Sequence, residues 1–383
     1  MSSSRDLLEA LVAFDTTSRE SNLQLIEFVR DYLARFEVPC ELIYNDERSK
    51  ANLFATIGPA DQPGIVLSGH TDVVPVDGQP WTVAPFQLTE RDGNLYGRGT
   101  ADMKGYIACV LALVPSLVQA SLRLPVHIAL SYDEEVGCLG VRSLLKALQQ
   151  RPVKPMLCII GEPTELKPVL GHKGKLAMRC DIHGEACHSA YAPLGVNAIE
   201  YAAELIGELG RIGQRLKAPE HHDARFDPPF STVQTGVISG GKALNIVPAD
   251  CRFDFEIRAL PSQDPGLVAQ ELQTYAEQQV LPRMRAVSDQ SEIRFSELSA
   301  YPGLATDAHS EAAELIAAFS GSGEFGTVAF GTEGGLFDAA GIATVVCGPG
   351  SMDQGHKPDE FVSLEQLNGC DEMLQRMLLS ISR

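Results

Sequence analysis

Residues 64–72 read GIVLSGHTD, and this stretch has the pattern of a buried strand that ends at polar residues. Two later stretches repeat the pattern, with VHIALSYDEE at residues 126–135 and LCIIGEPT at residues 157–164. Short, continuous, β-branched runs that end at polar turn residues are typical of strands buried on both faces. Apolar residues at helical spacing lie before and between these runs, which predicts an α/β fold with a largely parallel sheet covered on both faces.

The same patterns give the extent of the predicted elements. Buried strands are expected near residues 64–68, 126–130, 157–160 and 344–347, and helices near residues 7–12, 25–36, 104–122, 141–149 and 311–319. The longest apolar run, near residues 107–117, is interrupted by Pro115 and is expected to be too short to span a bilayer.

A different pattern begins after about residue 173. Leu176, Met178, Cys180 and Ile182 alternate with polar residues, as in a strand with one buried face. Further strands are expected near residues 232–238, 251–257 and 293–295, with helices near residues 196–216 and 266–280. The order β-α-β-β-α-β is typical of a small ferredoxin-like α+β sandwich. We therefore predict an α/β domain of residues 1–173 and 291–383, interrupted by an α+β domain of residues 174–290.

Composition disfavours several classes of partner. The chain has 383 residues and a formal charge of −19 at pH 7, which repels nucleic acid and anionic membrane surfaces. No secretory signal is recognisable at the N-terminus. The nine cysteines are scattered and form no CxxC pair, so we expect reduced thiols in a cytoplasmic protein.

Residues that suit metal chemistry follow the predicted strands. The carboxyl ends of strands in an open α/β sheet meet at one edge, where ligands bind. Seven candidate residues are expected at this edge: His70, Asp72, Asp102, Glu134, Glu135, Glu162 and His356. Two imidazoles and three carboxylates suit a pair of borderline divalent ions such as zinc, with one carboxylate bridging.

The remaining acidic residues of this set can divide the other tasks. Of the adjacent Glu134 and Glu135, one can bind metal while the other takes a proton from water. Asp72 can fix the tautomer of His70. Each residue alone has an ordinary alternative, since Asp102 can cap a helix and the two glutamates can lie in a solvated loop. The prediction therefore rests on the occurrence of the whole set of residues at one edge of the sheet.

The motifs GHTDVVPV, GRGTADMKG, SYDEEVG, GEPT and GHKPDE resemble those of the two-zinc aminoacylase and carboxypeptidase family. The resemblance covers essentially the whole chain, including the inserted domain. It implies one metal held by His70, Asp102 and Glu162. It implies a second metal held by Asp102, Glu135 and His356, with Asp102 bridging the two.

The resemblance also implies roles for other residues. Glu134 is expected to be the general base and Asp72 the orienting acid. The inserted domain is expected to form a homodimer through its sheet and to act as a lid. His188 matches a family histidine that stabilises the oxyanion in the partner subunit's site. Cys187 stands before it, where glycine is common.

Three further residues are candidates for contact with the substrate. Arg258 and Asn245 match residues that bind the substrate carboxylate in relatives, although Arg258 can also simply pair at a strand end. Glu333 lies among glycines and is a candidate partner for a substrate ammonium, with a solvated turn residue as the alternative.

Within the family, the chain is most similar to members that deacetylate N2-acetyl-L-ornithine. The resemblance therefore implies a zinc-dependent amidohydrolase, in which cobalt can substitute, that acts on a small N-acyl amino acid and serves arginine biosynthesis. Alternatives are a succinyl-diaminopimelate desuccinylase or another acylase or dipeptidase of the family. An inactive binding or scaffold relative is disfavoured, because every expected ligand and Glu134 are present.

Overall fold

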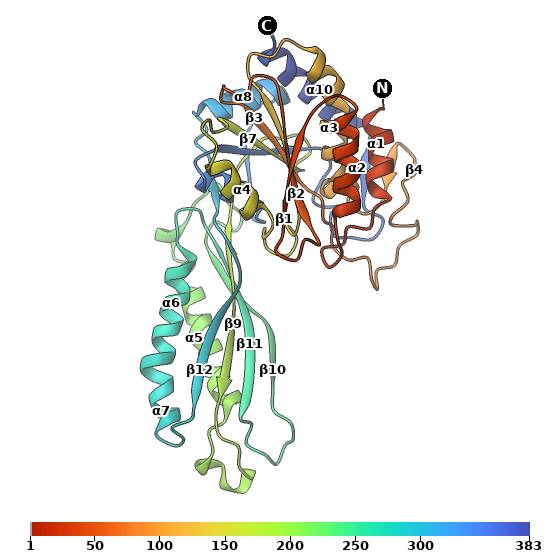
Figure 1. The fold of residues 1–383 in the computed structure, drawn as a ribbon. Coiled ribbons are helices and arrows are strands. Elements are labelled where there is room, and N and C mark those ends of the chain that lie inside the picture. The colour runs from red at the N-terminus through yellow and green to blue at the C-terminus, as the bar shows by residue number, and fades with distance from the viewer. Residues whose placement is uncertain (1) are drawn as a thin grey trace. The chain divides into compact units, whose positions relative to one another are not determined.

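The computed structural model describes residues 2–383, which divide into two compact units (Figure 1). The first unit contains the described residues up to Gly171 together with Leu304–Thr327 and Thr332–Arg383. The inserted unit contains His172–Gly303 and Val328–Gly331. It continues past residue 290, because the strand Glu292–Tyr301 belongs to its sheet.

A nine-stranded sheet forms the centre of the first unit. Its strands are β1 (Cys40–Tyr44), β2 (Ala51–Ile57), β3 (Ile65–His70), β6 (Val126–Ser131), β7 (Leu157–Pro163), β8 (Val169–His172), β13 (Leu304–Ala305), β14 (Gly326–Val328) and β15 (Ala343–Gly348). The order is β1-β2-β6-β3-β7-β15-β8-β13, with β14 beside β8. The four strands predicted from the sequence are the adjacent parallel strands β6, β3, β7 and β15. The mainly parallel sheet is thus confirmed, with antiparallel strands on either side.

Helices of the first unit pack on this sheet in two groups. The helices are α1 (Ser4–Val12), α2 (Leu23–Ala34), α3 (Gly105–Gln119), α4 (Val141–Gln149), α8 (Glu311–Ser320), α9 (Gly334–Ala339) and α10 (Leu364–Ile381). The helix α3 contacts α1 and α10, and α10 contacts α8, whereas α4 packs against α9. The long helix α10 is absent from the sequence-based predictions.

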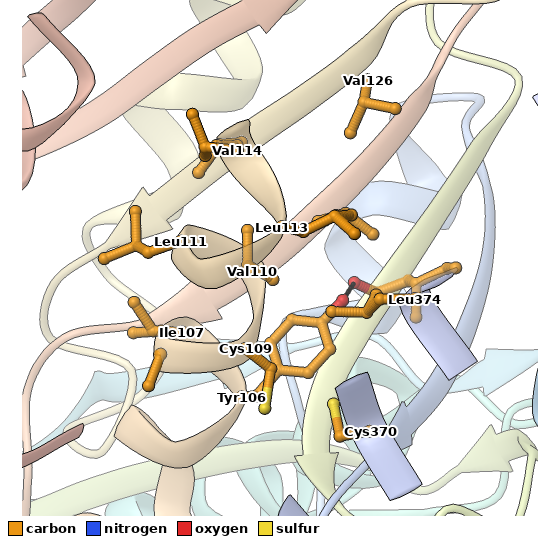
Figure 2. Close-up of a cluster of buried hydrophobic side chains, with 14 of the residues drawn as sticks. Tyr106, Ile107, Cys109, Val110, Leu111, Leu113, Val114, Val126, Cys370 and Leu374 are labelled. Atoms are coloured by element: carbon orange, nitrogen blue, oxygen red, sulfur yellow. Dashed lines mark hydrogen bonds between the residues drawn. The ribbon is translucent and has the colours of Figure 1, made fainter. Parts of the chain in front are cut away.

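The helix α3 lies at the centre of the largest core. Figure 2 shows its buried side chains, among them Tyr106 and Val110, beside Cys370 and Leu374 of α10. The segment Thr100–Gln119 is long and apolar enough to cross a membrane by length and composition, yet 83% of the window that passes this test is buried inside the protein. That burial is typical of a core helix.

The helix predicted near residues 104–122 is confirmed, because α3 continues through Pro115 to Gln119. The expectation that Pro115 leaves the apolar run too short to span a bilayer is wrong by length. A proline lacks the N–H that would bond the carbonyl four residues earlier. In α3 that carbonyl belongs to Leu111, and it accepts a hydrogen bond of 3.1 Å from the hydroxyl of Tyr32. A tertiary contact therefore satisfies the group that proline leaves without its helical partner.

A small three-stranded sheet brings two distant segments of the first unit together. It contains β4 (Thr89–Arg91), β5 (Asn94–Tyr96) and β16 (Phe361–Ser363) in the order β16-β5-β4. The strand β5 leads toward Asp102, and β16 follows His356 by a few residues. Pairing of β5 with β16 thus places two of the predicted metal ligands on adjoining segments.

The inserted unit is the predicted split β-α-β-β-α-β arrangement. Its elements are β9 (Gly174–His183), α5 (Ala198–Leu216), β10 (Thr232–Gly240), β11 (Asp250–Ala259), α6 (Pro265–Tyr275), α7 (Leu281–Arg285) and β12 (Glu292–Tyr301). The antiparallel order is β10-β11-β9-β12. Apolar residues of β9 and β11 face α5 and α6, whereas their polar residues form ion pairs such as Arg179–Asp254, at 2.8 Å. The sheet is therefore apolar on its helix-covered face and charged on the other.

Candidate metal centre

The parallel strands of the first unit deliver acidic and imidazole side chains to one edge of the sheet. His70 is the last residue of β3, and Glu162 lies near the end of β7. Glu134 and Glu135 lie in the turn after β6. Because β6, β3 and β7 are parallel neighbours, their ends meet at the same edge.

Five of the predicted residues form two groups that share one member. His70, Asp102 and Glu162 each offer a ligand atom within 4.8 Å of the others, and so do Asp102, Glu135 and His356. Asp102 directs Oδ1 toward Nε2 of His70 at 2.9 Å and Oδ2 toward Nε2 of His356 at 3.2 Å. The two oxygens of one carboxylate thus face the two groups.

The spacing of these atoms suits divalent cations. Ligand atoms around a tetrahedral ion with bonds of about 2.1 Å lie roughly 3.4 Å apart. The Nε2 of His70 lies 3.7 Å from Oε1 of Glu162, and the Nε2 of His356 lies 3.0 Å from Oε2 of Glu135. These distances are close to the spacing that an ion of this size requires, in both groups.

The electrostatics of the site also favour cations. Burial raises the pKa of Glu162 well above its usual range, and the charge of Asp102 raises it further. Hydrogen bonds to Asp102 and Glu135 raise the pKa of His356 to about 11. Buried carboxylates at such short range are costly without positive charge beside them. Metal ions that displace the imidazole protons supply that charge, so the residues present fit a pair of divalent cations.

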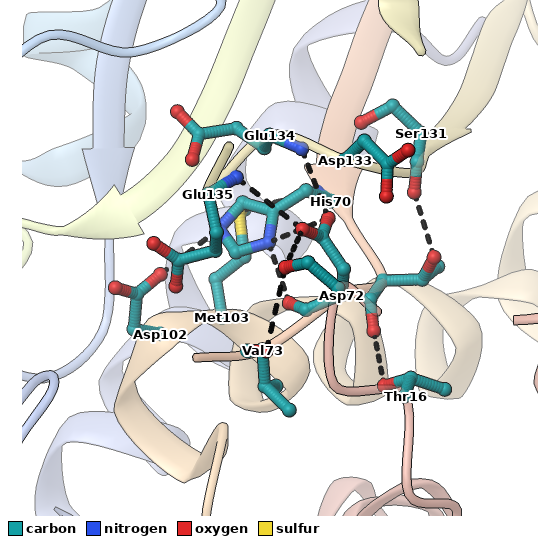
Figure 3. A network of polar contacts seen from close by, with 12 residues as sticks. Thr16, His70, Asp72, Val73, Asp102, Met103, Ser131, Asp133, Glu134 and Glu135 are labelled. Carbon is teal, nitrogen blue, oxygen red and sulfur yellow. Dashed lines mark hydrogen bonds and ion pairs between the residues drawn. The ribbon is translucent and has the colours of Figure 1, made fainter. Parts of the chain in front are cut away.

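Asp72 contacts the site in two ways, which Figure 3 shows together. Its backbone carbonyl lies 2.9 Å from Nδ1 of His70, which leaves Nε2 directed at Asp102. Its carboxylate Oδ1 is 3.7 Å from the same Nδ1, too far for a hydrogen bond. Instead, Oδ1 accepts from the backbone N–H of Glu134 at 3.1 Å, and Oδ2 accepts from that of Glu135 at 3.3 Å. The backbone of Asp72 orients the imidazole, and its carboxylate holds the turn of the two glutamates.

Other contacts fix this turn and the carboxylate of Glu134. Asp133, which has a left-handed φ of 56°, forms an ion pair with Lys50. The thiol of the buried Cys138 lies 3.4 Å from Oε1 of Glu134. Burial raises the pKa of Glu134 well above its usual range, and the charge of Glu135 raises it further. Glu134 is therefore a better proton acceptor than an exposed carboxylate.

Glu333 lies in the first unit, at the start of α9. Its side chain is 2% exposed, and among residues 2–383 its Oε1 has no hydrogen-bond partner. Burial raises the pKa of Glu333 to about 7. The solvated turn that the sequence left open for this residue is thus excluded.

The other predicted contact residues lie in the inserted unit. Arg258 donates from Nη1 to the hydroxyl of Tyr301 at 2.9 Å and also pairs with Glu256. The backbone carbonyl of Asn245 accepts from the N–H of Ser189 at 3.0 Å.

His188 accepts a hydrogen bond of 3.1 Å at Nδ1 from the backbone N–H of Ala190. A neutral imidazole carries one proton, so the proton of His188 must be on Nε2. Its side chain is consequently a hydrogen-bond donor at Nε2.

Several residues that contact the predicted site residues, or the segments that carry them, were not predicted from the sequence. These are Ser18, Lys50, Arg98, Cys138, Tyr301 and Glu360. Ser18 and Lys50 precede the predicted strands, and their partners lie at distant positions in the chain. Arg98 and Glu360 lie within the GRGTADMKG and GHKPDE motifs, and this was the available signal for these two residues.

The fold and the two joined ligand groups define a hydrolase that uses two divalent metal ions. The chain belongs to peptidase family M20/M25/M40, whose family model matches residues 66–380.

The chain is similar to known proteins over nearly its whole length. An acetylornithine deacetylase of Pasteurella multocida is 35% identical over 97% of this chain and 96% of its own length. An acetylornithine deacetylase of Myxococcus xanthus is 37% identical over the same shares. Among solved structures, an M20 metallo-carboxypeptidase of Sulfolobus solfataricus superposes with a TM-score of 0.77 at 19% identity and covers 99% of both chains. A dinuclear metal-binding peptidase of Bacillus subtilis has a TM-score of 0.68 at 15% identity and covers 99% of this chain and 97% of its own.

Proposed function

We propose that this chain is a cytoplasmic enzyme that hydrolyses N2-acetyl-L-ornithine to acetate and L-ornithine, with two zinc ions as its cofactors. The proposed metal chemistry rests on the position of Asp102, whose two carboxylate oxygens face His70 and His356. The substrate rests on the two deacetylases that match nearly the full chain. Imidazole and carboxylate donors suit zinc, and cobalt can occupy the same donor set.

His70, Asp102 and Glu162 would hold one ion, and Asp102, Glu135 and His356 the other. When bound, such a pair of ions polarises an amide carbonyl and makes a water molecule acidic. The metal ligands must be held in a fixed orientation for this role. The carbonyl of Asp72 orients the imidazole of His70, and the carboxylate of Asp72 holds the backbone N–H of Glu135.

Glu134 is the proposed general base. It takes the proton from the attacking water and passes it to the nitrogen of the leaving ornithine. Its raised pKa supports this role, because a carboxylate whose pKa is raised by burial accepts a proton more readily than an exposed one. The hydrogen bond from the N–H of Glu134 to Asp72 holds the base in the turn after β6.

Arg258 and Asn245 are the proposed partners of the substrate carboxylate. The hydroxyl of Tyr301 fixes one arm of the Arg258 guanidinium, and a planar guanidinium can bind a carboxylate through two hydrogen bonds. Glu333 is the proposed partner of the δ-ammonium. A buried carboxylate oxygen without a partner is costly, and an ammonium group would satisfy it.

We also propose that the chain works as a homodimer in which His188 stabilises the oxyanion of the partner subunit's site. The Nε2–H of His188 is the kind of donor that this role requires. The edge strand β10 exposes Val237 and Ile238, and the adjoining loop exposes Leu244 and Ile246. Exposed apolar residues along an edge strand are a typical surface for pairing with a second chain.

Release of acetate from N2-acetyl-L-ornithine by the purified, zinc-loaded protein tests the substrate. N-succinyl-diaminopimelate and a set of dipeptides serve as competing substrates under the same conditions. The proposal expects N2-acetyl-L-ornithine to have the highest kcat/KM. A higher value for the succinylated substrate or for a dipeptide would move the assignment to another activity of the family.

A further inference from the structure

Glu360 is a buried acid that the chemistry described so far does not use. It directly precedes β16, and it is 1% exposed. Its carboxylate forms an ion pair of 2.6 Å with Arg98, whose side chain is also 1% exposed. A charged pair withdrawn from water to this degree needs further hydrogen bonds to be tolerated.

The carboxylate of Glu360 obtains these bonds from the segment that carries Asp102. Oε1 accepts from the backbone N–H groups of Ala101 and Asp102, both at 3.0 Å. Oε2 accepts from the N–H of Gly99 at 3.1 Å and from Nη1 of Arg98. Four donors on one short segment therefore converge on a single side chain, and the last of them is the backbone of the bridging ligand.

The same contacts reach the segment that carries His356. Arg98 donates from Nη1 to the carbonyl of Lys357 at 3.3 Å and from Nη2 to Oε1 of Gln79 at 2.6 Å. Gln79 in turn donates from Nε2 to the carbonyl of His356 at 3.0 Å. All residues joined by these hydrogen bonds belong to the first unit.

We infer that Glu360 and Arg98 are positioning residues that set Asp102 and His356 relative to each other, so that the second metal is bound tightly. This inference rests on the proposed two-metal function. Asp102 and His356 lie far apart in the sequence, and the Glu360–Arg98 pair joins their backbones. Neither Glu360 nor Arg98 needs to touch metal or substrate for this role.

The backbone pairing of β5 with β16 already holds these two segments together, and it does not involve the Glu360 carboxylate. A carboxylate that only stabilised the fold would therefore not be needed at this position. The carboxylate instead binds the backbone at the bridging ligand itself. Residues that orient metal ligands typically change metal affinity by about 10- to 100-fold when they are replaced. Metal affinity, measured on folded protein, therefore separates the two roles.

The test is calorimetric titration of zinc into metal-free wild type and Glu360→Gln, with bound zinc measured by elemental analysis. Glutamine has one acceptor oxygen, so its NH2 group must face two of the four donors whichever way the amide turns. We expect at least one of the two zinc equivalents to bind about 10- to 100-fold more weakly. Glu90→Gln is the matched control, because Glu90 lies in β4 of the same small sheet and pairs with an arginine, Arg5 of α1, but is exposed. It should bind zinc like the wild type.

Arg98→Lys provides a second variant in case Glu360→Gln does not fold. Lysine keeps the charge beside Glu360 but lacks the second arm that reaches Gln79, so only the metal held by His356 should weaken. Folded Glu360→Gln or Arg98→Lys protein that binds two zinc equivalents with wild-type affinity would overturn the inference. A wild type that fails to bind two equivalents would instead overturn the proposed function.

Discussion

The contacts of Asp72 predict a particular defect for Asp72→Asn. The substitution keeps the size of the side chain but replaces one carboxylate oxygen with an NH2 group. The wild-type carboxylate accepts from Glu134 N–H, from Glu135 N–H and from the hydroxyl of Ser18, the last at 2.7 Å. An amide oxygen in the place of Oδ2 keeps the acceptor for both Ser18 and Glu135. The NH2 group then faces the N–H of Glu134, which cannot accept a hydrogen bond.

The size of the defect follows from these contacts. One hydrogen bond to a charged acceptor is lost outright, and such bonds are worth about 1.5–3 kcal/mol. At about 1.4 kcal/mol for each factor of ten, kcat should fall between about 10- and 150-fold if the whole loss appears in the transition state. The orientation of His70 should be preserved, because the backbone carbonyl of Asp72 provides it.

The assay combines kcat on N2-acetyl-L-ornithine with zinc content by elemental analysis. Asp72→Asn should keep two zinc ions while kcat falls. Ser18→Ala is the matched control, since it removes one donor to the same carboxylate and leaves both glutamate contacts intact. Its kcat should stay within a few-fold of wild type.

Two results would refute this reasoning. If kcat of Asp72→Asn stays within about twofold of wild type, the carboxylate does not hold the general base. If the variant loses one zinc ion and Ser18→Ala does not, the carboxylate acts through a metal ligand, either Glu135 or His70, rather than through the general base.

Four further predictions concern the proposed site. Glu134→Gln should lower kcat by at least about 100-fold, as expected for loss of a general base, with zinc content unchanged; near-native turnover would make Glu134 a bystander. Asp102→Ala should lose zinc as well as activity, because both groups lose an oxygen, and two tightly bound ions by elemental analysis would contradict the bridge. Mixed His188→Ala and Glu134→Gln subunits should regain activity, since some heterodimers hold one intact shared site; demonstrated heterodimers without activity would argue against sharing. Glu333→Gln should raise KM for N2-acetyl-L-ornithine, because it removes the partner of a desolvated ammonium, yet spare N-acetylmethionine; equal losses on both substrates would assign Glu333 to the fold or the metals.

Much of the fold was predictable because burial leaves a direct mark on sequence. The strands β3, β6, β7 and β15 are buried on both faces and read as continuous apolar runs. The alternation in β9 follows from one covered face. The helix α10 carries a comparable signal, with buried residues such as Leu367, Cys370 and Leu374 at helical spacing, and it was predictable on the same grounds. The short strands β4, β5 and β16 leave no such mark, because three residues give too little pattern.

The kinds of chemical group at this site, and the edge of the sheet at which they lie, can be inferred from the order of residues along the chain. Acidic and imidazole residues follow buried strands, and strand ends meet at one edge for any chain that folds this way. Which atoms face each other is set when the chain folds. Folding directs the carboxylate of Asp72 to the glutamate turn rather than to His70, and it joins Glu360 to the backbone of Asp102. A hydrogen bond depends on distances of about 3 Å and on direction, and spacing along the chain specifies neither for residues that meet only after folding.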